Sequence, residues 1–353
     1  MKAVVKYDYG PNKTELRDVP VPEIGDDDIL MEVKAAAVCG SDVGFDAGTH
    51  EGGLHCPVIL GHEFSGVVAK VGKNVTDWKV GERVVSDNTG KVCGKCYSCE
   101  TGEYLLCTER LGLGYGMDGG FARYVRIPGE TVKVFPGCLF HIPECMSFEE
   151  AAMMDPVCNA YRAVVQDGCI KAGETVAVFG VGPIGLFCIQ VARAAGAAKI
   201  IAVGLTADKE ALELAKKFGA THTLMSDVDD VISAVNDITN GEGVALSVDA
   251  AGAPVCVKIA IEITRPMGNL VRIAYNPAPL NFPLDRLVDK AIQLKGHFGY
   301  DWVSWKNCFA LIEAGRIDMK SLISHRMSIS QFAEAIELMK QRKATKIILY
   351  PED

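Results

Sequence analysis

The sequence predicts an α/β protein that combines a β-rich module with a doubly wound parallel sheet. Residues 1–150 contain short β-branched segments between turns rich in Gly, Asp and Pro, and no long periodic helix. From residue 174 onward, apolar strands alternate with amphipathic helices, which is the pattern of parallel β-α-β units. A chain of 353 residues is long enough to form two domains, each with its own core.

The β-rich module is predicted from short segments near the N-terminus. The segments expected to be strands are 1–7, 28–38, 65–72 and 82–85. Near the C-terminus the sequence predicts helices at 303–315 and 329–341 and a final strand at 346–351. We expect this C-terminal part to return to the first module.

The doubly wound part begins with a glycine-rich turn. Residues 174–180 form a predicted strand, and "GVGPIG" at 180–185 leads directly into an amphipathic helix. Gly180 permits the tight turn, Gly182 lets the backbone approach a pyrophosphate, and Gly185 lets the helix pack on the strand. A G-x-G-x-x-G pattern between strand and helix is the signature of a dinucleotide site, although a glycine-rich turn of another α/β domain remains the alternative.

The alternation continues downstream and predicts a parallel sheet. The elements expected are helix 207–218, strand 222–225, helix 228–238, strand 244–249, helix 254–264, and strands 268–274 and 292–297.

Composition narrows the classes of partner. The formal net charge is −9 with no block of Lys or Arg, so we expect neither nucleic acid nor an anionic membrane as a partner. No segment approaches the roughly 18 apolar residues of a membrane helix, and the N-terminus does not resemble a signal peptide. We expect a cytoplasmic protein with a small-molecule partner, forming a homodimer or a homotetramer.

Four of the 13 cysteines cluster in the loop 91–107, "KVCGKCYSCETGEYLLC". Their spacing places four thiols around one short loop, as a tetrahedral zinc ion requires. The candidate ligands are Cys93, Cys96, Cys99 and Cys107. A redox pair would need only two of them, and an iron-sulfur centre is possible, but nothing nearby indicates electron transfer. Four thiolates leave no open coordination position, so this metal is expected to be structural.

A second, mixed set of possible ligands lies elsewhere in the chain. Cys39, His62 and Glu63 supply a thiolate, an imidazole and a carboxylate, the types found at zinc sites that keep one position open. Asp155 adds a carboxylate among apolar residues, where an unpaired charge would be costly. Each residue alone is a weak signal, because a lone buried Cys or His is more often an ordinary core residue.

Together these motifs resemble those of the zinc-dependent medium-chain dehydrogenases. The motifs are "CGSD" at 39–42, "GHEFSG" at 61–66, the four-cysteine loop, "DP" at 155–156 and "GVGPIG" at 180–185. The chain most resembles the branch of sorbitol and other polyol dehydrogenases and threonine dehydrogenase, over essentially its whole length. The resemblance implies a GroES-like catalytic domain, residues 1–155 and 298–353, an inserted Rossmann domain, residues 156–297, and an active site in the cleft between them.

The resemblance also implies the composition of the active site. Cys39, His62 and Glu63 match catalytic zinc ligands, and Asp155 matches an acidic fourth position that binds zinc directly or through water. With the four-cysteine loop, this gives two zinc ions per chain.

The resemblance implies roles for two further residues, one in orienting a metal ligand and one in proton transfer. Asp42 matches a residue that orients the ring of His62. Ser41 matches the hydroxyl that relays the substrate proton, while the hydride passes to a nicotinamide. The expected reaction is hydride transfer between the secondary alcohol of a polyol or sugar-derived substrate and the cofactor.

The sequence also departs from the family pattern. Many relatives have a His three residues after the relay hydroxyl, where this chain has Gly44. The sequence therefore does not identify the group at the outer end of the proton path. Polyol dehydrogenases often have an Arg where this chain has Gly299, so sorbitol itself is not predicted. The alternatives are a threonine or short-chain diol or alcohol dehydrogenase, a metal-free reductase, and a non-catalytic zinc-binding scaffold.

The sequence favours NAD slightly over NADP. Domains that prefer NAD usually end their second strand with an acidic residue, and this chain has Gly204 there. Thr206 and Lys209 could meet a 2′-phosphate, but the turn has no Arg and Asp208 adds a negative charge. The residues expected to bind the dinucleotide are Gly180, Gly182, Pro183, Ile184, Gly185, Gly204, Thr206 and Lys209.

Overall fold

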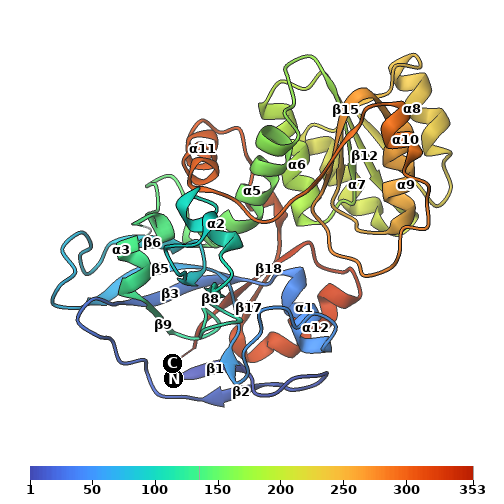
Figure 1. Ribbon diagram of the computed structural model, residues 1–353. Coiled ribbons are helices and arrows are strands. Elements are labelled where there is room, and N and C mark those ends of the chain that lie inside the picture. The colour runs from blue at the N-terminus through green and yellow to red at the C-terminus, as the bar shows by residue number, and fades with distance from the viewer. Residues whose placement is uncertain (135, 353) are drawn as a thin grey trace. The chain divides into compact units, whose positions relative to one another are not determined.

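The computed structural model describes residues 1–134 and 136–352, which form two compact units (Figure 1). The first unit comprises Met1–Asp155 and Met319–Asp353, and the second comprises Pro156–Asp318. The boundary predicted at residue 298 differs from this division. Residues 298–318 cluster with the second unit, where Asn307 of helix α11 (Trp302–Glu313) donates a hydrogen bond to the Tyr161 hydroxyl at 2.8 Å.

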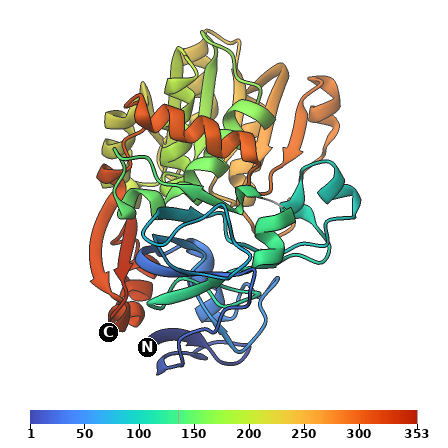
Figure 2. The ribbon, with the colours of Figure 1, turned by 90° about the vertical axis from the view of Figure 1, so that its left-hand side faces the viewer.

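A mixed sheet is the frame of the first unit. Its strand order is β10-β6-β5-β3-β18-β17, and β9 also pairs with β3. The central strand β3 (Ile29–Ala37) is antiparallel to β5 (Glu63–Val71) on one side and to β18 (Lys346–Tyr350) on the other. The C-terminal strands, red in Figure 2, therefore complete a sheet that begins with N-terminal strands, as the sequence predicts.

The first unit contains further short elements around this sheet. They are β1 (Lys2–Lys6), β2 (Thr14–Asp18), α1 (Gly40–Ala47), β4 (Val58–Ile59), β6 (Arg83–Ser86), β7 (Thr89–Lys91), α2 (Tyr97–Glu100), β8 (Leu111–Gly112), β9 (Tyr124–Ile127), α3 (Gly129–Val134), β10 (Leu139–His141), α4 (Phe148–Ala152), β17 (Ile323–Ser328) and α12 (Phe332–Lys340). Helix α5 (Met154–Tyr161) begins in this unit and continues into the second.

The core of the first unit is built from both ends of the chain. Ile29 and Met31 of β3 and Phe64 of β5 belong to the same buried cluster as Phe332 and Ile336 of α12. Positions 332 and 336 are one helical turn apart, so α12 presents one apolar stripe to this core. The C-terminal helix is thus part of the first unit's hydrophobic core.

The second unit is a six-stranded parallel sheet with the order β13-β12-β11-β14-β15-β16. Its elements are β11 (Thr175–Phe179), α6 (Pro183–Ala194), β12 (Lys199–Gly204), α7 (Lys209–Phe218), β13 (His222–Met225), α8 (Val231–Thr239), β14 (Val244–Asp249), α9 (Pro254–Ile263), β15 (Thr264–Arg272), α10 (Asp285–Asp289), β16 (Gln293–Gly296) and α11. The order reverses at β11, which follows the doubly wound arrangement.

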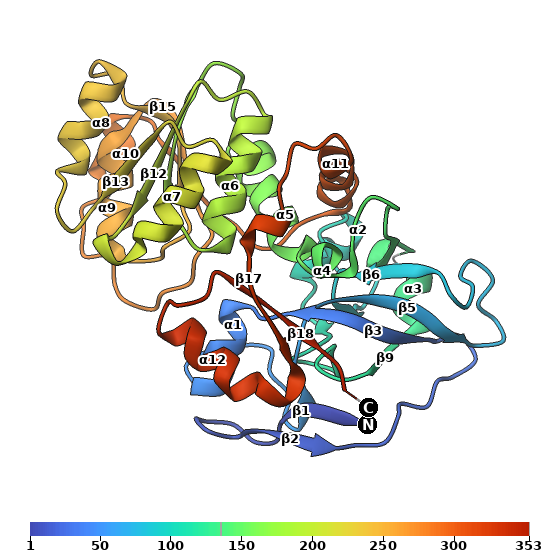
Figure 3. The same cartoon turned by 180° about the vertical axis from the view of Figure 1, so that it is seen from behind.

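Helices cover this sheet in two groups. Helix α6 packs with α7, and α8 packs with α9, as Figure 3 shows. The burial of Val235 on α8 and of Ala260 on α9 places both in one core with strands β11 and β12. Among the described residues, no helix is both long enough and apolar enough to cross a lipid bilayer.

The glycine-rich turn joins β11 to α6 in the predicted way. Gly180 has φ +92°, a conformation that favours glycine. A Cβ on Gly185 would lie 1.9 Å from the carbonyl oxygen of Gly180, so only glycine allows this approach of helix and strand. Gly182 is the N-cap of α6, and a Cβ there would meet no atom within 4 Å.

This contrast gives a matched pair of substitutions. Gly185→Ala is expected to lower the free energy of unfolding by about 2–3 kcal/mol, because the methyl group forces α6 away from the strand. Gly182→Ala is expected to lower it by no more than about 1 kcal/mol, since the added atom meets nothing and alanine is only a poorer N-cap residue than glycine. Urea denaturation followed by circular dichroism measures both, and equal effects of the two substitutions would contradict the packing role of Gly185.

Candidate active site and metal sites

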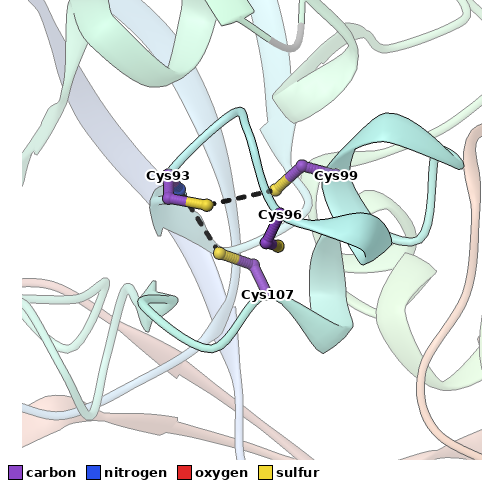
Figure 4. A group of neighbouring side chains, drawn as sticks. All are labelled: Cys93, Cys96, Cys99 and Cys107. Carbon is purple, nitrogen blue, oxygen red and sulfur yellow. Dashed lines mark hydrogen bonds between the residues drawn. The ribbon is translucent and has the colours of Figure 1, made fainter.

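The loop between β7 and β8 gathers the four cysteines predicted to bind zinc. The sulfur atoms of four cysteines lie within 4.8 Å of one another (Figure 4): Cys93, Cys96, Cys99 and Cys107. Cys96 is the N-cap of α2, so the short helix turns Cys99 back towards Cys93. The backbone N–H of Cys93 donates to the sulfur of Cys107 at 3.3 Å, which draws the two ends of the loop together.

This geometry and donor chemistry fit a closed zinc site. The sulfur atoms of Cys93 and Cys99 are 4.0 Å apart, close to the ~3.8 Å expected around tetrahedral zinc with bonds of about 2.3 Å. A hydrogen bond from the backbone N–H of Cys99 lowers the pKa of the Cys96 thiol to about 6, whereas burial raises the pKa of Cys99 to about 12. A bound cation would stabilise the thiolate of Cys99, which its surroundings otherwise disfavour.

Three neighbouring strands bring the mixed set of side chains to one end of the first unit's sheet. Glu63 begins β5 and pairs with Ala37, the last residue of β3. Cys39 follows two residues later. Ile348 of β18 also pairs with Ala37, so Lys346, at the start of β18, lies beyond the end of β3 as well. The sheet register therefore places Cys39, Glu63 and Lys346 together.

Cys39, His62 and Glu63 form a compact group. One ligand atom from each lies within 4.8 Å of the other two. His62 and Glu63 are buried, whereas Cys39 is half-buried. Sulfur, nitrogen and oxygen donors from three residues suit a zinc ion with a coordination position left for a substrate. The structure thus brings together three of the four residues predicted for the open metal site.

Helix α1 places two more predicted residues around the ring of His62. Asp42 accepts a hydrogen bond from the backbone N–H of Cys39 at 2.8 Å, and its other oxygen lies 3.6 Å from Nδ1 of His62. The hydroxyl of Ser41 lies 3.2 Å from Nε2 of His62, a contact whose donor depends on the tautomer of the ring. The carboxylate and the hydroxyl therefore face opposite nitrogens of one imidazole.

The electrostatic balance of this group is that of a cation site. Burial alone would lower the pKa of His62, but the charges of Asp42 and Cys39 outweigh it and raise the pKa well above its usual value. Burial raises the pKa of Glu63, and Lys346 opposes this shift from 2.5 Å away. The negative groups here favour a bound cation, and Lys346 neutralises part of their charge.

Asp155 is not part of the compact group of three. Within the described ranges, the group with ligand atoms less than 4.8 Å apart contains Cys39, His62 and Glu63. The carboxylate of Asp155 accepts a hydrogen bond from the side-chain amide of Asn88 at 2.9 Å. Its charge still acts on Glu63, whose pKa it helps to raise after the larger effect of burial. A role for Asp155 as the fourth position stays a prediction.

Sequence reasoning missed Lys346 and Asn88. Lys346 heads an apolar strand, "KIILY", and a single Lys before such a run on a strand returning to the core was a usable signal. Asn88 has φ +56° in a loop, and no pattern in the sequence connects it to Asp155, 67 positions away.

His50 lies next to Gly44, the position at which many relatives have a histidine. A Cβ on Gly44 would lie 2.9 Å from the Cβ of His50. The ring of His50 stacks on that of Phe45 with centroids 5.3 Å apart.

The turn after β12 contains the residues expected to select the cofactor. Gly204 ends β12, and Thr206 and Lys209 are exposed. The carboxylate of Asp227 accepts hydrogen bonds from the backbone N–H of Thr206 at 2.9 Å and from its hydroxyl at 2.5 Å. Asp208 accepts from the N–H of Leu205 at 3.0 Å. Asp227 is therefore an acidic residue at this turn that sequence reasoning missed.

Known families match both units. Residues 25–137 match the alcohol dehydrogenase GroES-like domain, and residues 183–314 match the zinc-binding dehydrogenase domain. An uncharacterised zinc-type alcohol dehydrogenase-like protein of Escherichia coli K12 is 39% identical over 99% of this chain and 98% of its own length. A sorbitol dehydrogenase of Halalkalibacterium halodurans is 33% identical over 100% of both chains.

A solved structure shows the same architecture. A protein assigned as a zinc-binding dehydrogenase from Sinorhizobium meliloti 1021, solved with bound NADP, superposes with a TM-score of 0.89 at 30% identity over 99% of both chains. The chain therefore belongs to the zinc-dependent medium-chain alcohol dehydrogenase family. The resemblance found in the sequence and the predicted fold class, a GroES-like domain with a Rossmann domain, are both confirmed.

Proposed function

We propose that the protein is a zinc-dependent, NAD-linked dehydrogenase that oxidises a secondary alcohol of a polyol or a sugar-derived substrate to a ketone, and catalyses the reverse reduction. The compact group of Cys39, His62 and Glu63 is the observation that carries this proposal. Zinc held there would stabilise negative charge on the substrate oxygen, and the nicotinamide would accept the hydride. Family membership supports the reaction class.

The chain's own residues supply orientation and proton transfer. Asp42, 3.6 Å from Nδ1 of His62, would hold the ring so that Nε2 faces the metal position. Ser41, next to that nitrogen, would take the proton that the alcohol hydroxyl loses and pass it outward. Lys346 would keep the carboxylate of Glu63 ionised beside the metal.

Metal content and turnover together test this proposal. Zinc measured by inductively coupled plasma mass spectrometry is expected at two ions per chain, one in each cysteine-containing group. Screening polyols, sugar alcohol phosphates, short diols and threonine for cofactor reduction is expected to find the best rates among the polyols. The best rates with threonine or butanediol would select those alternatives, and a single zinc without turnover would favour a scaffold.

The surroundings of Thr206 support NAD over NADP. A 2′-phosphate at this turn would meet the carboxylates of Asp208 and Asp227, and both donors of Thr206 already bind Asp227. Lys209 is the cation that would have to overcome this repulsion. The NADP in the Sinorhizobium meliloti structure belongs to that protein, and it makes a direct comparison of both cofactors necessary.

Steady-state kinetics gives the expected result for this turn. Asp227→Asn is expected to lower the NAD-over-NADP ratio of kcat/KM by about tenfold, or roughly 1.4 kcal/mol, because it removes a repulsive charge. Asp237→Asn, on the exposed face of α8, removes the same charge away from the turn and should leave the ratio unchanged. A wild-type preference for NADP above roughly tenfold would overturn the NAD proposal. Lys209→Ala should then erase that preference.

We further propose that the enzyme is cytoplasmic and forms a homodimer or homotetramer. Size-exclusion chromatography with light scattering measures the oligomeric state, and a monomer at assay concentration would refute this part.

A further inference from the structure

The four-cysteine loop is connected to the open metal site by one arginine. Arg110 follows Cys107 by three residues, and its backbone N–H donates to the carbonyl of Cys107 at 3.1 Å. The sulfur of Cys107 in turn accepts from the backbone N–H groups of Cys93 at 3.3 Å and Glu109 at 3.4 Å. Fixing Cys107 by a metal therefore also fixes the backbone from which Arg110 extends.

The guanidinium of Arg110 reaches two groups beside the open site. One nitrogen donates to the side-chain oxygen of Asn88 at 2.6 Å, and the amide of Asn88 donates to Asp155 at 2.9 Å. Another nitrogen donates to the hydroxyl of Tyr115, and the guanidinium also lies 5.5 Å from the centre of its ring. The ring of Tyr115 meets that of His62 edge-on, with centroids 6.0 Å apart. One side chain thus supports two predicted metal-site residues, Asp155 and His62.

The backbone makes this connection rigid. Strands β7 and β8 pair through Thr89 and Gly112, and Leu113 donates to the carbonyl of Asn88 at 2.7 Å. Asn88 is buried and adopts φ +56°, a conformation that few residues other than glycine and asparagine accept readily. Asn88 and Arg110 are therefore held across one small antiparallel sheet, with the cysteine loop as the connection between its strands.

We propose that Arg110 is a positioning residue that transmits the order of the four-cysteine loop to the open metal site, by holding Asp155 through Asn88 and His62 through Tyr115. This inference rests on the proposed function, because it requires a metal at the Cys39 group. It gives the loop metal a second role, in which it controls how firmly the other metal is held. Residues that support metal ligands in this way typically change metal affinity by about 10–100-fold.

The test measures how fast each metal leaves the intact, zinc-loaded enzyme. With excess chelator present, zinc release is followed by a colorimetric reporter, and Cys39→Ser identifies the phase that belongs to the open site. Arg110→Met is expected to speed that phase by about tenfold or more, without changing release from the cysteine loop. Arg123→Met, which removes a partly exposed arginine of the same unit, is the matched control and should match the wild type.

Two further variants separate positioning from general stability. Asn88→Gly removes the amide while still accepting a positive φ, and should speed release from the open site to a similar extent. The double variant should be no faster than the faster single one, because both residues act in one chain. Arg110→Lys retains the positive charge but loses the planar guanidinium that donates to Asn88 and Tyr115 at the same time. Its rate of zinc release from the open site is therefore expected to lie between those of the wild type and Arg110→Met.

Coupling to the loop is tested with Cys96→Ser. This variant weakens the loop site and is expected to speed release from the open site as well, but only when Arg110 is present. When Co²⁺ replaces zinc in the open site, the thiolate ligand gives the metal visible absorption bands. The Arg110→Met substitution is expected to shift these bands. If Arg110→Met released zinc from the open site at a rate within twofold of that of Arg123→Met, the inference would be overturned while the proposed function would stand. An equal acceleration of both release phases in Arg110→Met would have the same consequence. A wild type with one zinc ion would overturn the proposed function and this inference together.

Discussion

Cys39→Ser is expected to lower kcat by about 10³-fold or more, while the melting temperature stays within a few degrees of the wild type. Cys39 contributes the only thiol to the compact group with His62 and Glu63, so the open site loses its softest ligand. Cys39 is half-buried at the start of α1, and serine keeps its shape and its N-cap position. Zinc content is expected to fall from two ions to one.

Cys93→Ser is the matched comparison from the closed site. Here the same replacement of sulfur by oxygen should clearly lower the melting temperature, because a structural metal contributes directly to the stability of the fold. Differential scanning calorimetry and zinc analysis of the two variants measure the contrast. Equal losses of melting temperature and equal residual activities would show that the two sites do not divide catalysis and stability between them.

Ser41→Ala is expected to lower kcat by about 10²–10⁴-fold, the usual effect of removing a positioned acid-base group. The Ser41 hydroxyl lies 3.2 Å from Nε2 of His62, beside the position proposed for the metal and the substrate oxygen. Asp42, Cys39 and His62 keep their mutual contacts in the variant, so both zinc ions should be retained.

Ser41→Thr provides the control for this prediction. It keeps a hydroxyl at the same position, so activity close to the wild type is expected together with an unchanged zinc content. Rates are compared from pH 6 to pH 10, because a lost proton path should show most clearly where substrate deprotonation limits turnover. Near-normal rates for Ser41→Ala across this range would mean that water or another residue carries the proton.

The fold could be predicted well where one pattern repeats. The strands of the second unit follow from the alternation of apolar strands and amphipathic helices, and β13 and β14 have the predicted bounds. The first unit was less predictable. Helix α1 was missed because its eight residues are too few for a clear period, and it begins at a candidate ligand. The position of α11 follows from contacts with α5, which no local pattern records.

The candidate site shows the same division. Residue types indicated Cys39, His62 and Glu63, and the family resemblance implied Ser41 and Asp42. The structure brings all five together. Spacing did not indicate Lys346, Asn88, Arg110 or Asp227, because their partners lie across strands whose pairing depends on the tertiary fold. Residues that belong to a recognisable motif were thus easier to predict than residues whose contacts depend on strand pairing.

The position of β18 between β3 and β17 has a consequence for biosynthesis. Residues 156–318 are contiguous and can fold as soon as they leave the ribosome, whereas β3 obtains its partner β18 only after synthesis reaches residue 350. Until then Ala36 and Ala37 at the end of β3 lack their partner strand, and Glu63 lacks the ammonium group of Lys346. The nascent chain can therefore complete its second unit before its first, and a chain released before residue 346 would lack both β18 and the ion pair of Glu63 with Lys346.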